Sequence, residues 1–587
     1  MKLTANNGLR TILRTRWLFT LIFLFGVSYA ALALQPTIAH AAASTTYYVS
    51  NKGNDAHPGT NKKKPWRSLA KVNSIRLNPG DRVLLERGGV WNEELIISSS
   101  GTAGSPVYFG TYGNGLNPLI VRTEPFTQWS LYYDDGVKKI WQGSVDLAGK
   151  RVRGLIEDGQ RITYLYIPNH TAPEAHLANN TFGPSNQPGD YRFFLRKDSG
   201  PPGSTLIGVR SHAIYVAGQS YVTIDGIDGY GPGATKSSLD QSAIIYTTEG
   251  SSHITLQNLT VSFSHEQGIA DGYWRNASSG LPAGGVGATG LYYSNITSHD
   301  NMAGGIYLRG SGTIMGCASY NNGLNLYDTG DKNGVNIQGG PTHVEGCHLY
   351  QLGNPASTLE SDFAIEVNNP VGSVTLVRNH IHDVAGGGIQ VSSETSNYAS
   401  NHLIAYNIIH RFGPADYANT TAGKLSGVRL QRADDVKVHN NVIAYGGASK
   451  LTRGLFVRYH SRNLSLKNNI FYHNANSDLY VYPETILDGF SANHNLYYKA
   501  NFTDNWNFLG TRYSLLALWQ LGTIQDLNSL DRDPQLIQST PSSADGFKLQ
   551  STSPAINAGI DVGLTQDFAG SPVTIANPPD MGSWEYY

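Results

Sequence analysis

The chain has 587 residues, with 43 Lys plus Arg against 44 Asp plus Glu and 65 glycines, a globular rather than a disordered composition. Its first 41 residues hold four basic and no acidic residues, so the remainder has a formal balance of 39 − 44 = −5. Phosphate binding needs clustered positive charge, so this mildly acidic chain excludes nucleic acid as a partner.

Residues 1–41 have the pattern of a signal peptide. Basic residues at positions 2–16 precede an uncharged run at 17–34, and Ala39-His40-Ala41 supplies a small-x-small cleavage site. We expect cleavage after Ala41 and a secreted or extracytoplasmic protein with no membrane partner. The alternative is an uncleaved membrane anchor, for which an apolar stretch of 18 residues is just long enough.

Residues 42–120 are predicted to form an N-terminal cap and the first turns of a coil, with a short helical run from Ser68 to Ile75. The phrases YYVS (47–50), GND (53–55), Pro-Gly-Asp (79–81) and SGTAGSP (100–106) closely resemble the start of exported right-handed parallel β-helix proteins of the carbohydrate-active class. The resemblance is specific for the fold and says little about the chemistry.

Residues 121–212 interrupt the coil with strand-like segments joined by hairpin turns, which predicts a small inserted β-rich module. This arrangement resembles β-helix glycoside hydrolases of the β-xylosidase type, and of the type that includes fucosidases and xylanases. In those enzymes a β-sandwich-like module interrupts the helix and helps to wall the active cleft.

Residues 213–500 repeat a short apolar unit. Its equivalent positions are spaced 24 to 39 residues apart, at Ile306, Val335, Ile365, Ile389, Val428, Leu455 and Leu479. The units alternate with period 2 and carry no helical stripe, so they are strands. Irregular unit length argues against a propeller. The sequence therefore predicts an all-β fold, a right-handed parallel β-helix with an inserted module and a C-terminal cap at 501–587, where it would cover the raw end of the solenoid.

A second ladder runs through Asn258, Asn295, Cys317, Cys347, Asn379, Asn407, Asn441, Asn469 and Asn495. The two cysteines would stack about 4.8 Å apart in successive turns. Outside the cell a disulfide is one interpretation. We favour two small stacked, unbridged residues, because parallel neighbours do not automatically have disulfide geometry.

Two columns of side chains should point out of the coil. The first holds Tyr307, Asn336, Glu366, Gln390, Arg429, Phe456 and Tyr480, and the second holds Arg309, Gln338, Asn368, Ser392, Gln431, Arg458 and Tyr482. Both are rich in hydrogen-bonding and aromatic groups, which favours a polyhydroxylated ligand. We expect Tyr307, Asn336, Gln390, Arg429 and Arg458 to contact a polysaccharide or oligosaccharide.

Three carboxylates, those of Asp331, Asp362 and Glu366, are predicted to meet in consecutive turns as acid and base or nucleophile. Direct stacking would separate two of them by about 5 Å, the range of retaining glycosidases, and a bulge would open the gap toward the inverting range. Clustered carboxylates raise one another's pKa, so one becomes a proton donor. The alternative is that Asp331 and Asp362 only cap turns.

The leading hypothesis is a secreted, monomeric glycoside hydrolase. One alternative is a polysaccharide lyase or uronate epimerase that uses Glu366, Arg429 and Arg458, and another is a non-catalytic carbohydrate-binding envelope protein. We expect no required cofactor. Calcium held by gathered carboxylates stays open, because no regular metal-binding spacing is present. His265 with Glu266, and His382 with Asp383, are minor candidates.

Overall fold

The computed structural model describes residues 44–165, 167, 172–187, 189–236, 242–248, 250–272, 287–324, 332–354, 363–370, 372–393, 398–414, 425–447, 451–483, 485, 487–499, 505–574 and 577–587. The chain divides into the units Met1–Ser44 and Thr45–Tyr587, and the fold below is that of the second. The predicted signal peptide lies outside the described residues. Within them, no helix has the length and apolar character needed to cross a membrane.

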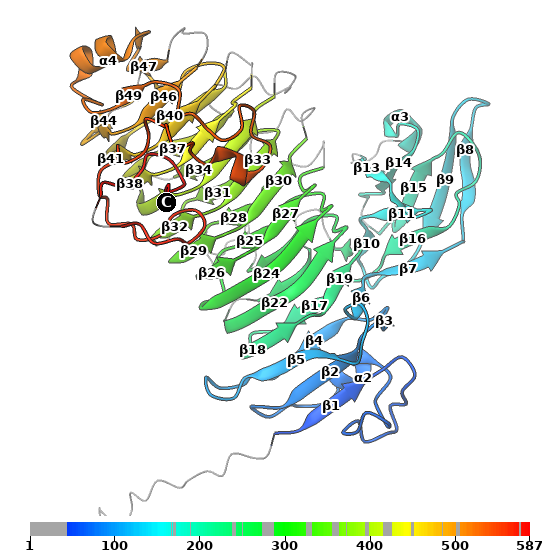
Figure 1. Ribbon diagram of the computed structural model, residues 1–587. Helices are drawn as coiled ribbons and strands as arrows, with labels where there is room; N and C mark the ends of the chain where they lie inside the picture. The colour runs from blue at the N-terminus through cyan, green and yellow to red at the C-terminus, as the bar shows by residue number, and fades with distance from the viewer. Residues whose placement is uncertain are drawn as a thin grey trace, which may run out of the picture. The chain divides into compact units, whose positions relative to one another are not determined.

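A 13-stranded sheet forms one side of the coil (Figure 1). All of its pairings are parallel except the last, between β47 and β48. Its strands are β4 (Leu95–Ile97), β17 (Ile214–Val216), β21 (Ala243–Thr247), β23 (Gln267–Asp271), β25 (Ile306–Leu308), β28 (Val335–Ile337), β31 (Phe363–Asn368), β34 (Gly387–Ser392), β37 (Ser426–Gln431), β40 (Arg453–Arg458), β43 (Leu479–Val481), β47 (Trp506–Phe508) and β48 (Thr511–Tyr513).

A 25-stranded sheet supplies two further rows of strands. The first row is β1 (Thr46–Val49), β2 (Arg82–Glu86), β5 (Val107–Tyr112), β18 (Ser220–Asp225), β22 (Ser252–Ser262), β24 (Leu291–His299), β26 (Gly312–Met315), β29 (Thr342–Glu345), β32 (Val374–Val377), β35 (Ala399–Ala405), β38 (Ala433–His439), β41 (Ser461–Lys467), β44 (Leu487–Asp488) and β45 (Ser491–Asn493). The second row is β3 (Val90–Trp91), β6 (Leu119–Val121), β19 (Asp228–Tyr230), β27 (Ala318–Tyr320), β30 (His348–Leu352), β33 (His380–Val384), β36 (Ile408–Phe412), β39 (Val442–Ala444), β42 (Ile470–Tyr472), β46 (Leu496–Tyr498) and β49 (Leu530–Asp531). β22 and β24 run through both rows, and each turn of the coil visits the two rows and then the 13-stranded sheet.

The core confirms the predicted repeat. The seven apolar positions from Ile306 to Leu479 pair in one unbroken parallel register and are at most 1% exposed. A glycine precedes most of them, because a Cβ there would meet the opposite wall of the coil. At Gly388, for example, it would lie 2.4 Å from the buried Ile409. The parallel β-helix fold that the sequence predicts is therefore confirmed.

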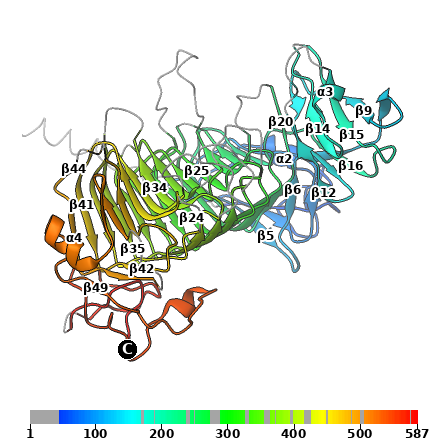
Figure 2. The same ribbon diagram turned by 90° about the horizontal axis from the view of Figure 1, so that it is seen from above.

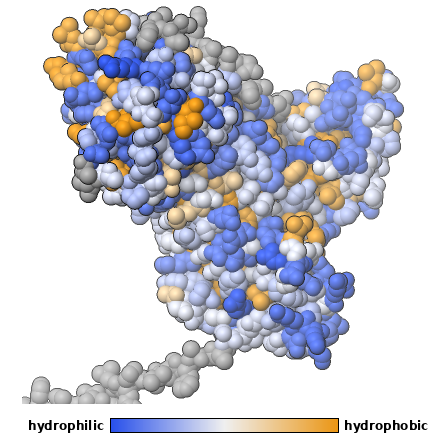
Figure 3. Space-filling model, viewed as in Figure 1, coloured by the Kyte–Doolittle hydropathy of each residue, from blue (hydrophilic) through white to orange (hydrophobic). Residues whose placement is uncertain are grey.

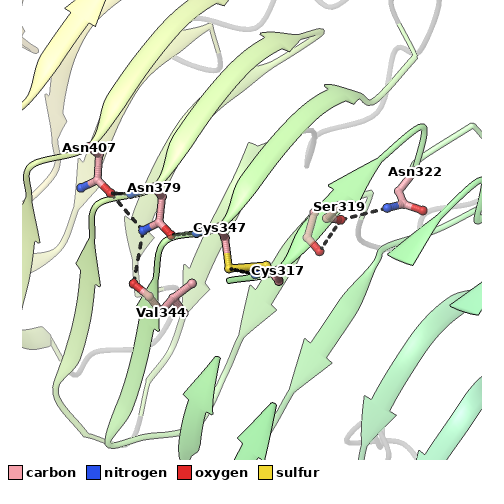
Figure 4. Close-up of a disulfide and its surroundings, with 8 residues drawn as sticks. Cys317, Ser319, Asn322, Val344, Cys347, Asn379 and Asn407 are labelled. Atoms are coloured by element: carbon pink, nitrogen blue, oxygen red, sulfur yellow. Dashed lines mark hydrogen bonds between the residues drawn. A yellow bond between two sulfur atoms is a disulfide. The ribbon is translucent and has the colours of Figure 1, made fainter. Parts of the chain in front are cut away.

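The polar ladder is confirmed from Cys317 onward (Figure 4). Buried asparagines donate side chain to side chain along it, at 2.9 Å from Asn379 to Asn407 and 3.0 Å from Asn407 to Asn441. Each also accepts the backbone N–H of the preceding ladder residue, beginning with Cys347 at 3.0 Å from Asn379 Oδ1. The ladder satisfies backbone groups where the turns bend.

Two expectations for this ladder are wrong. Asn258 and Asn295 stand one position earlier, aligned with Gly316, and they are exposed with φ of 56° and 52°. Asparagine suits both a left-handed corner and a buried ladder, so residue type does not tell them apart. The cysteines, for which we favoured unbridged thiols, form a disulfide, with their Cα atoms 4.4 Å apart.

The inserted module consists of two small sheets whose side chains share apolar clusters. One sheet holds β7 (Thr123–Phe126), β11 (Leu155–Glu157), β12 (Gln160–Arg161) and β16 (Thr205–Gly208). The other holds β8 (Ser130–Asp134), β9 (Lys139–Ser144), β13 (Thr163–Tyr164), β14 (Thr181–Pro184) and β15 (Arg192–Arg196), with α3 (Pro173–His176) beside it in sequence. β10 (Arg151–Val152) pairs with β20 (Ala234–Thr235), which joins the module to the coil.

Both ends of the coil are covered. At the start, α2 (Leu69–Asn73) begins after the N-cap Ser68 and buries Leu69 and Val72, so the helix is shorter than the predicted run. At the other end, α4 (Leu516–Thr523) buries Trp519 and leaves Leu518 and Leu521 exposed. This helix lies at the apolar patch at the upper left of Figure 3. A short 3₁₀ turn spans Ala544–Phe547.

The last residues of the chain run back along one flank of the coil (Figures 1 and 2). Phe547, Met581 and Trp584 pack against Ile408 and Ile470 of the second row. The C-terminal cap therefore covers a flank as well as the raw end.

Candidate functional site

The outward face of the 13-stranded sheet carries the first predicted column in register. Tyr307 pairs with Asn336, Asn336 with Glu366, and Glu366 with Gln390. The register then continues through Arg429, Phe456 and Tyr480. The column is polar in the middle and aromatic at both ends.

These side chains are more enclosed than an exposed binding surface would be. Glu366 is 2% exposed and Asn336 is 2% exposed, although neither belongs to the apolar core of the coil. The second column is more open, with Asn368, Gln431 and Arg458 partly exposed and only Ser392 buried. The first column therefore points out of the coil as predicted, but its side chains are buried.

Glu366 is the centre of a hydrogen-bond network. Its Oε2 accepts from Asn333 Nδ2 at 2.5 Å and from Asn336 Nδ2 at 3.5 Å, and its Oε1 accepts from Gln390 Nε2 at 2.8 Å. Gln390 Nε2 also lies 3.2 Å from Ser392 Oγ. Amide donors from the two turns on either side of Glu366 thus hold one buried carboxylate in a fixed orientation, as an acid, base or nucleophile requires.

Asn333 is a functional candidate that we did not predict. It stands two residues before β28 and is fully buried, next to the buried Lys332. The sequence feature that could have indicated Asn333 is its position in the segment Lys-Asn-Gly, directly before Val335, whose side chain points into the coil. Its contact with Glu366 depends on stacking between turns, which residue type alone does not indicate.

The two arginines project where predicted. Arg429 follows Gln390 in the first column, is 7% exposed, and donates from Nη2 to Gln431 Oε1 at 2.7 Å. Arg458 lies in the second column, with its guanidinium 4.3 Å from the ring centre of Tyr459 and 5.8 Å from that of Tyr482. Positive charge and aromatic surface therefore share one end of the face.

The other end of the first column is aromatic. Tyr246 and Tyr307 are buried in a small cluster, and Tyr215 packs beside them. His212 stacks on Tyr215 and Tyr246, with ring centres 5.3 and 4.9 Å apart. Burial lowers the pKa of His212 to about 3, so this ring is a neutral stacking partner at pH 7.

Asp331 and Asp362, the other predicted catalytic carboxylates, lie outside the described residues. Asp331 is two residues before Asn333 in the sequence, and Asp362 directly precedes β31. The pairing of carboxylates that we predicted therefore stays a prediction, and with it the retaining or inverting outcome.

The minor candidate pair His265 and Glu266 lies where the module joins the coil. His265 Nδ1 accepts the backbone N–H of Gly233 at 3.1 Å, and Glu266 Oε2 accepts that of Ser242 at 2.5 Å. Burial holds the pKa of His265 well below its usual range. Both side chains accept hydrogen bonds from backbone N–H groups, which supports a structural role for this pair.

Comparisons with known proteins agree with this architecture. Residues 325–485 match the family model described as right handed beta helix region. The coil is a right-handed β-helix. The structure of XylC in complex with xylose covers 92% of this chain and 98% of its own, with 11% identity and a TM-score of 0.56, which supports the fold alone.

Matches to proteins named lacto-N-biosidase occur in both the sequence and the structure comparisons. A lacto-N-biosidase of Bifidobacterium longum subsp. longum is 43% identical over 83 residues, which are 13% of this chain and 5% of that protein. The chain thus matches a small part of the relative's length. A solved lacto-N-biosidase from Eubacterium ramulus is 17% identical, covers 83% of this chain and 67% of its own, and has a TM-score of 0.32.

Proposed function

We propose that this β-helix is a glycoside hydrolase whose reaction centres on Glu366. The observation that carries the proposal is a buried carboxylate that accepts amide hydrogens from Asn333, Asn336 and Gln390. A purely structural coil has no use for a buried carboxylate on its outer side, because burying such a group costs free energy.

The surroundings of Glu366 suit a sugar. Hydrogen-bonding side chains occupy the same column, tyrosines stand at one end, and Phe456 and Tyr480 stand at the other with ring centres 5.5 Å apart. Apolar ring faces beside a few fixed polar groups are typical of small-molecule sites. The sequence match to a lacto-N-biosidase supports hydrolysis of an oligosaccharide over other chemistry.

Two acids are needed for hydrolysis, and we propose that Asp331 or Asp362 supplies the second. Asp362 directly precedes Phe363, the first residue of the strand that carries Glu366. Asp331 lies two residues before Asn333, which donates to Glu366. We propose Arg429, Arg458 and Tyr307 as substrate contacts. No cofactor is required by this chemistry.

Glu366→Gln is the test. Removal of a proton-transfer group or nucleophile should lower turnover about 10²–10⁴-fold or more, because the amide cannot exchange a proton. The purified protein is incubated with neutral, N-acetylated and uronate-containing glycans, and reducing ends are measured. Asp331→Asn and Asp362→Asn, tested singly, identify the second acid.

Asp561→Asn is the matched control, because Asp561 is an exposed carboxylate of the C-terminal segment and should leave turnover unchanged. Full activity of Glu366→Gln with an intact circular dichroism spectrum would remove Glu366 from the mechanism.

Arg429 favours a second candidate, a lyase or uronate epimerase. It lies two turns from Glu366 in the same column, and a buried guanidinium could neutralise a uronate carboxylate. Such a lyase releases an unsaturated product that absorbs in the ultraviolet, whereas a hydrolase releases reducing ends without that absorbance. A protein that only binds glycans releases neither.

A further inference from the structure

A histidine cluster lies on the second row of the 25-stranded sheet, away from the sheet that carries Glu366. His348 of β30 pairs in register with His380 of β33, and His382 of β33 pairs with His410 of β36. The column of His348 and His380 continues as Ile408, Val442 and Ile470, which the C-terminal segment covers. Histidines therefore occupy this column in the earlier turns, and aliphatic residues occupy it in the later turns, which the C-terminal segment covers.

The ring nitrogens converge. His348 Nε2 lies 2.8 Å from His382 Nε2, and His380 Nε2 lies 2.9 Å from His410 Nε2. One ligand atom from each of His348, His380 and His382 lies within 4.8 Å of the others. Two nitrogens bound to one tetrahedral Zn²⁺ are about 3.3 Å apart, given bonds of 2.0–2.1 Å. Metal binding would draw the three ligand atoms from within 4.8 Å of one another to that spacing.

The second layer of contacts orients the lone pairs. Asp383 Oδ2 lies 2.6 Å from His382 Nδ1, and because a carboxylate only accepts, the proton sits on Nδ1 and leaves a lone pair on Nε2, which faces His348. A carboxylate behind a histidine is the usual support of a metal ligand. Arg411 does not add net charge there, because it pairs with Asp383 through bonds of 2.6 and 2.7 Å.

His410 has a different role. Arg411 Nη1 lies 2.9 Å from His410 Nδ1, and because a guanidinium only donates, the proton of His410 sits on Nε2 and points toward His380. His410 is therefore a donor to its neighbour rather than a ligand. His380 Nε2 is in turn an acceptor, with its lone pair directed toward His410.

Burial favours the neutral form of His348 and His380. Burial and the neighbouring histidines lower the pKa of His380 to about 3, and burial also lowers the pKa of His348. Metals bind the neutral form of imidazole.

We propose that His348, His380 and His382 form a binding site for a divalent transition metal of the Zn²⁺ type. Three imidazoles without a carboxylate ligand suit zinc and its neighbours and disfavour calcium or magnesium, which prefer oxygen. The metal would join two consecutive turns of the coil and keep at least one coordination position for water or another ligand. The site is independent of the proposed glycan chemistry.

The test is titration of the full chain, purified without a polyhistidine tag and stripped with a chelator, with ZnCl₂ at pH 7.5 in a calorimeter. We expect one ion per chain with a dissociation constant in the micromolar range or tighter. His348→Ala/His382→Ala should weaken binding at least 100-fold, and Asp383→Asn about 10–100-fold. Co²⁺ should give the visible absorption bands of a tetrahedral site in the wild type alone.

His343→Ala is the matched control, because His343 is on the neighbouring strand β29 and contacts Glu345 rather than the cluster. It should bind zinc like the wild type. Metal-free melting curves of all variants check folding. Absence of stoichiometric zinc binding by the wild type, or equal binding by a folded His348→Ala/His382→Ala variant, overturns the proposal.

Discussion

Two acidic residues, Glu366 and Asp271, break the residue pattern of the coil. Glu366 occupies an outward position of strand β31, yet it is buried and held by amides. Asp271 is the reverse case, since it occupies the inward position that Leu308 holds in the next turn. Its carboxylate accepts the backbone N–H groups of Ala288, Arg309 and Gly310 at 2.7–2.9 Å. We interpret Asp271 as a structural acid.

Asp271 predicts a pH dependence of stability. Burial raises its pKa from an ordinary value of 3.8 to about 7, so the folded state holds the proton more tightly than the unfolded state. Its contribution to stability is complete below pH 3.8 and is lost as the pH rises through about 7. The thermal midpoint of the wild type should therefore fall from pH 5 to pH 7.5, and Asp271→Asn should reduce that fall. Equal slopes in the two proteins would contradict this account.

Among the structural elements, the strand corners depend on the asparagine ladder. Asn441 Nδ2 donates to Ile404 O at 2.9 Å and to Asn469 Oδ1 at 3.0 Å, while its Oδ1 accepts the Asn407 N–H at 2.9 Å. The ladder ends at Asp526, whose Oδ1 accepts from Asn495 Nδ2 at 2.9 Å. The disulfide occupies the same position at the other end, where a covalent bond joins successive turns in place of a side-chain hydrogen bond.

Asn441→Ala should lower the free energy of unfolding by about 3 kcal/mol, because it leaves a buried N–H and a buried C=O without partners. Urea unfolding followed by tryptophan fluorescence measures the change. Asn528→Ala, at an exposed position of the same residue type, should have little effect. If both variants unfold at the same urea concentration, the ladder does not stabilise the corners.

At the scale of the whole molecule, the C-terminal segment closes a flank that the coil would otherwise expose. Met581 is 1% exposed and belongs to the apolar cluster that includes Ile408 and Ile470. The backbone N–H of Gly582 also donates to Asn468 O at 2.7 Å. The outward-facing apolar side chains of the second row are buried because the C-terminal segment packs against them.

Met581→Asp should detach this segment, because an unpaired carboxylate in an apolar interface costs several kcal/mol. We expect a protease to cut within residues 533–587 much faster than in the wild type, with fragments identified by mass spectrometry. Ile537→Asp is the control in the same segment, since Ile537 is 55% exposed. Unchanged resistance of Met581→Asp would show that the segment is held by other contacts.

Much of the fold was predictable because strand alternation is a local property. The inward series from Ile306 to Leu479 and the outward column through Glu366 follow from period-2 patterning, which places alternate side chains on opposite faces. The inserted module and the cap follow from the loss of that rhythm. The role of Asn333 and the enclosure of Glu366 were not predictable, since both depend on side chains from other turns.

The sequence by itself determined that this protein winds as a parallel coil with polar and aromatic residues on its outside. Only the tertiary structure decided that Asn258 stands one position out of the ladder, that Cys317 and Cys347 are bonded, and that His348 and His382 meet. The physical reason is that alternation depends on adjacent residues, whereas register and lateral contact depend on how turns 24 to 39 residues apart stack.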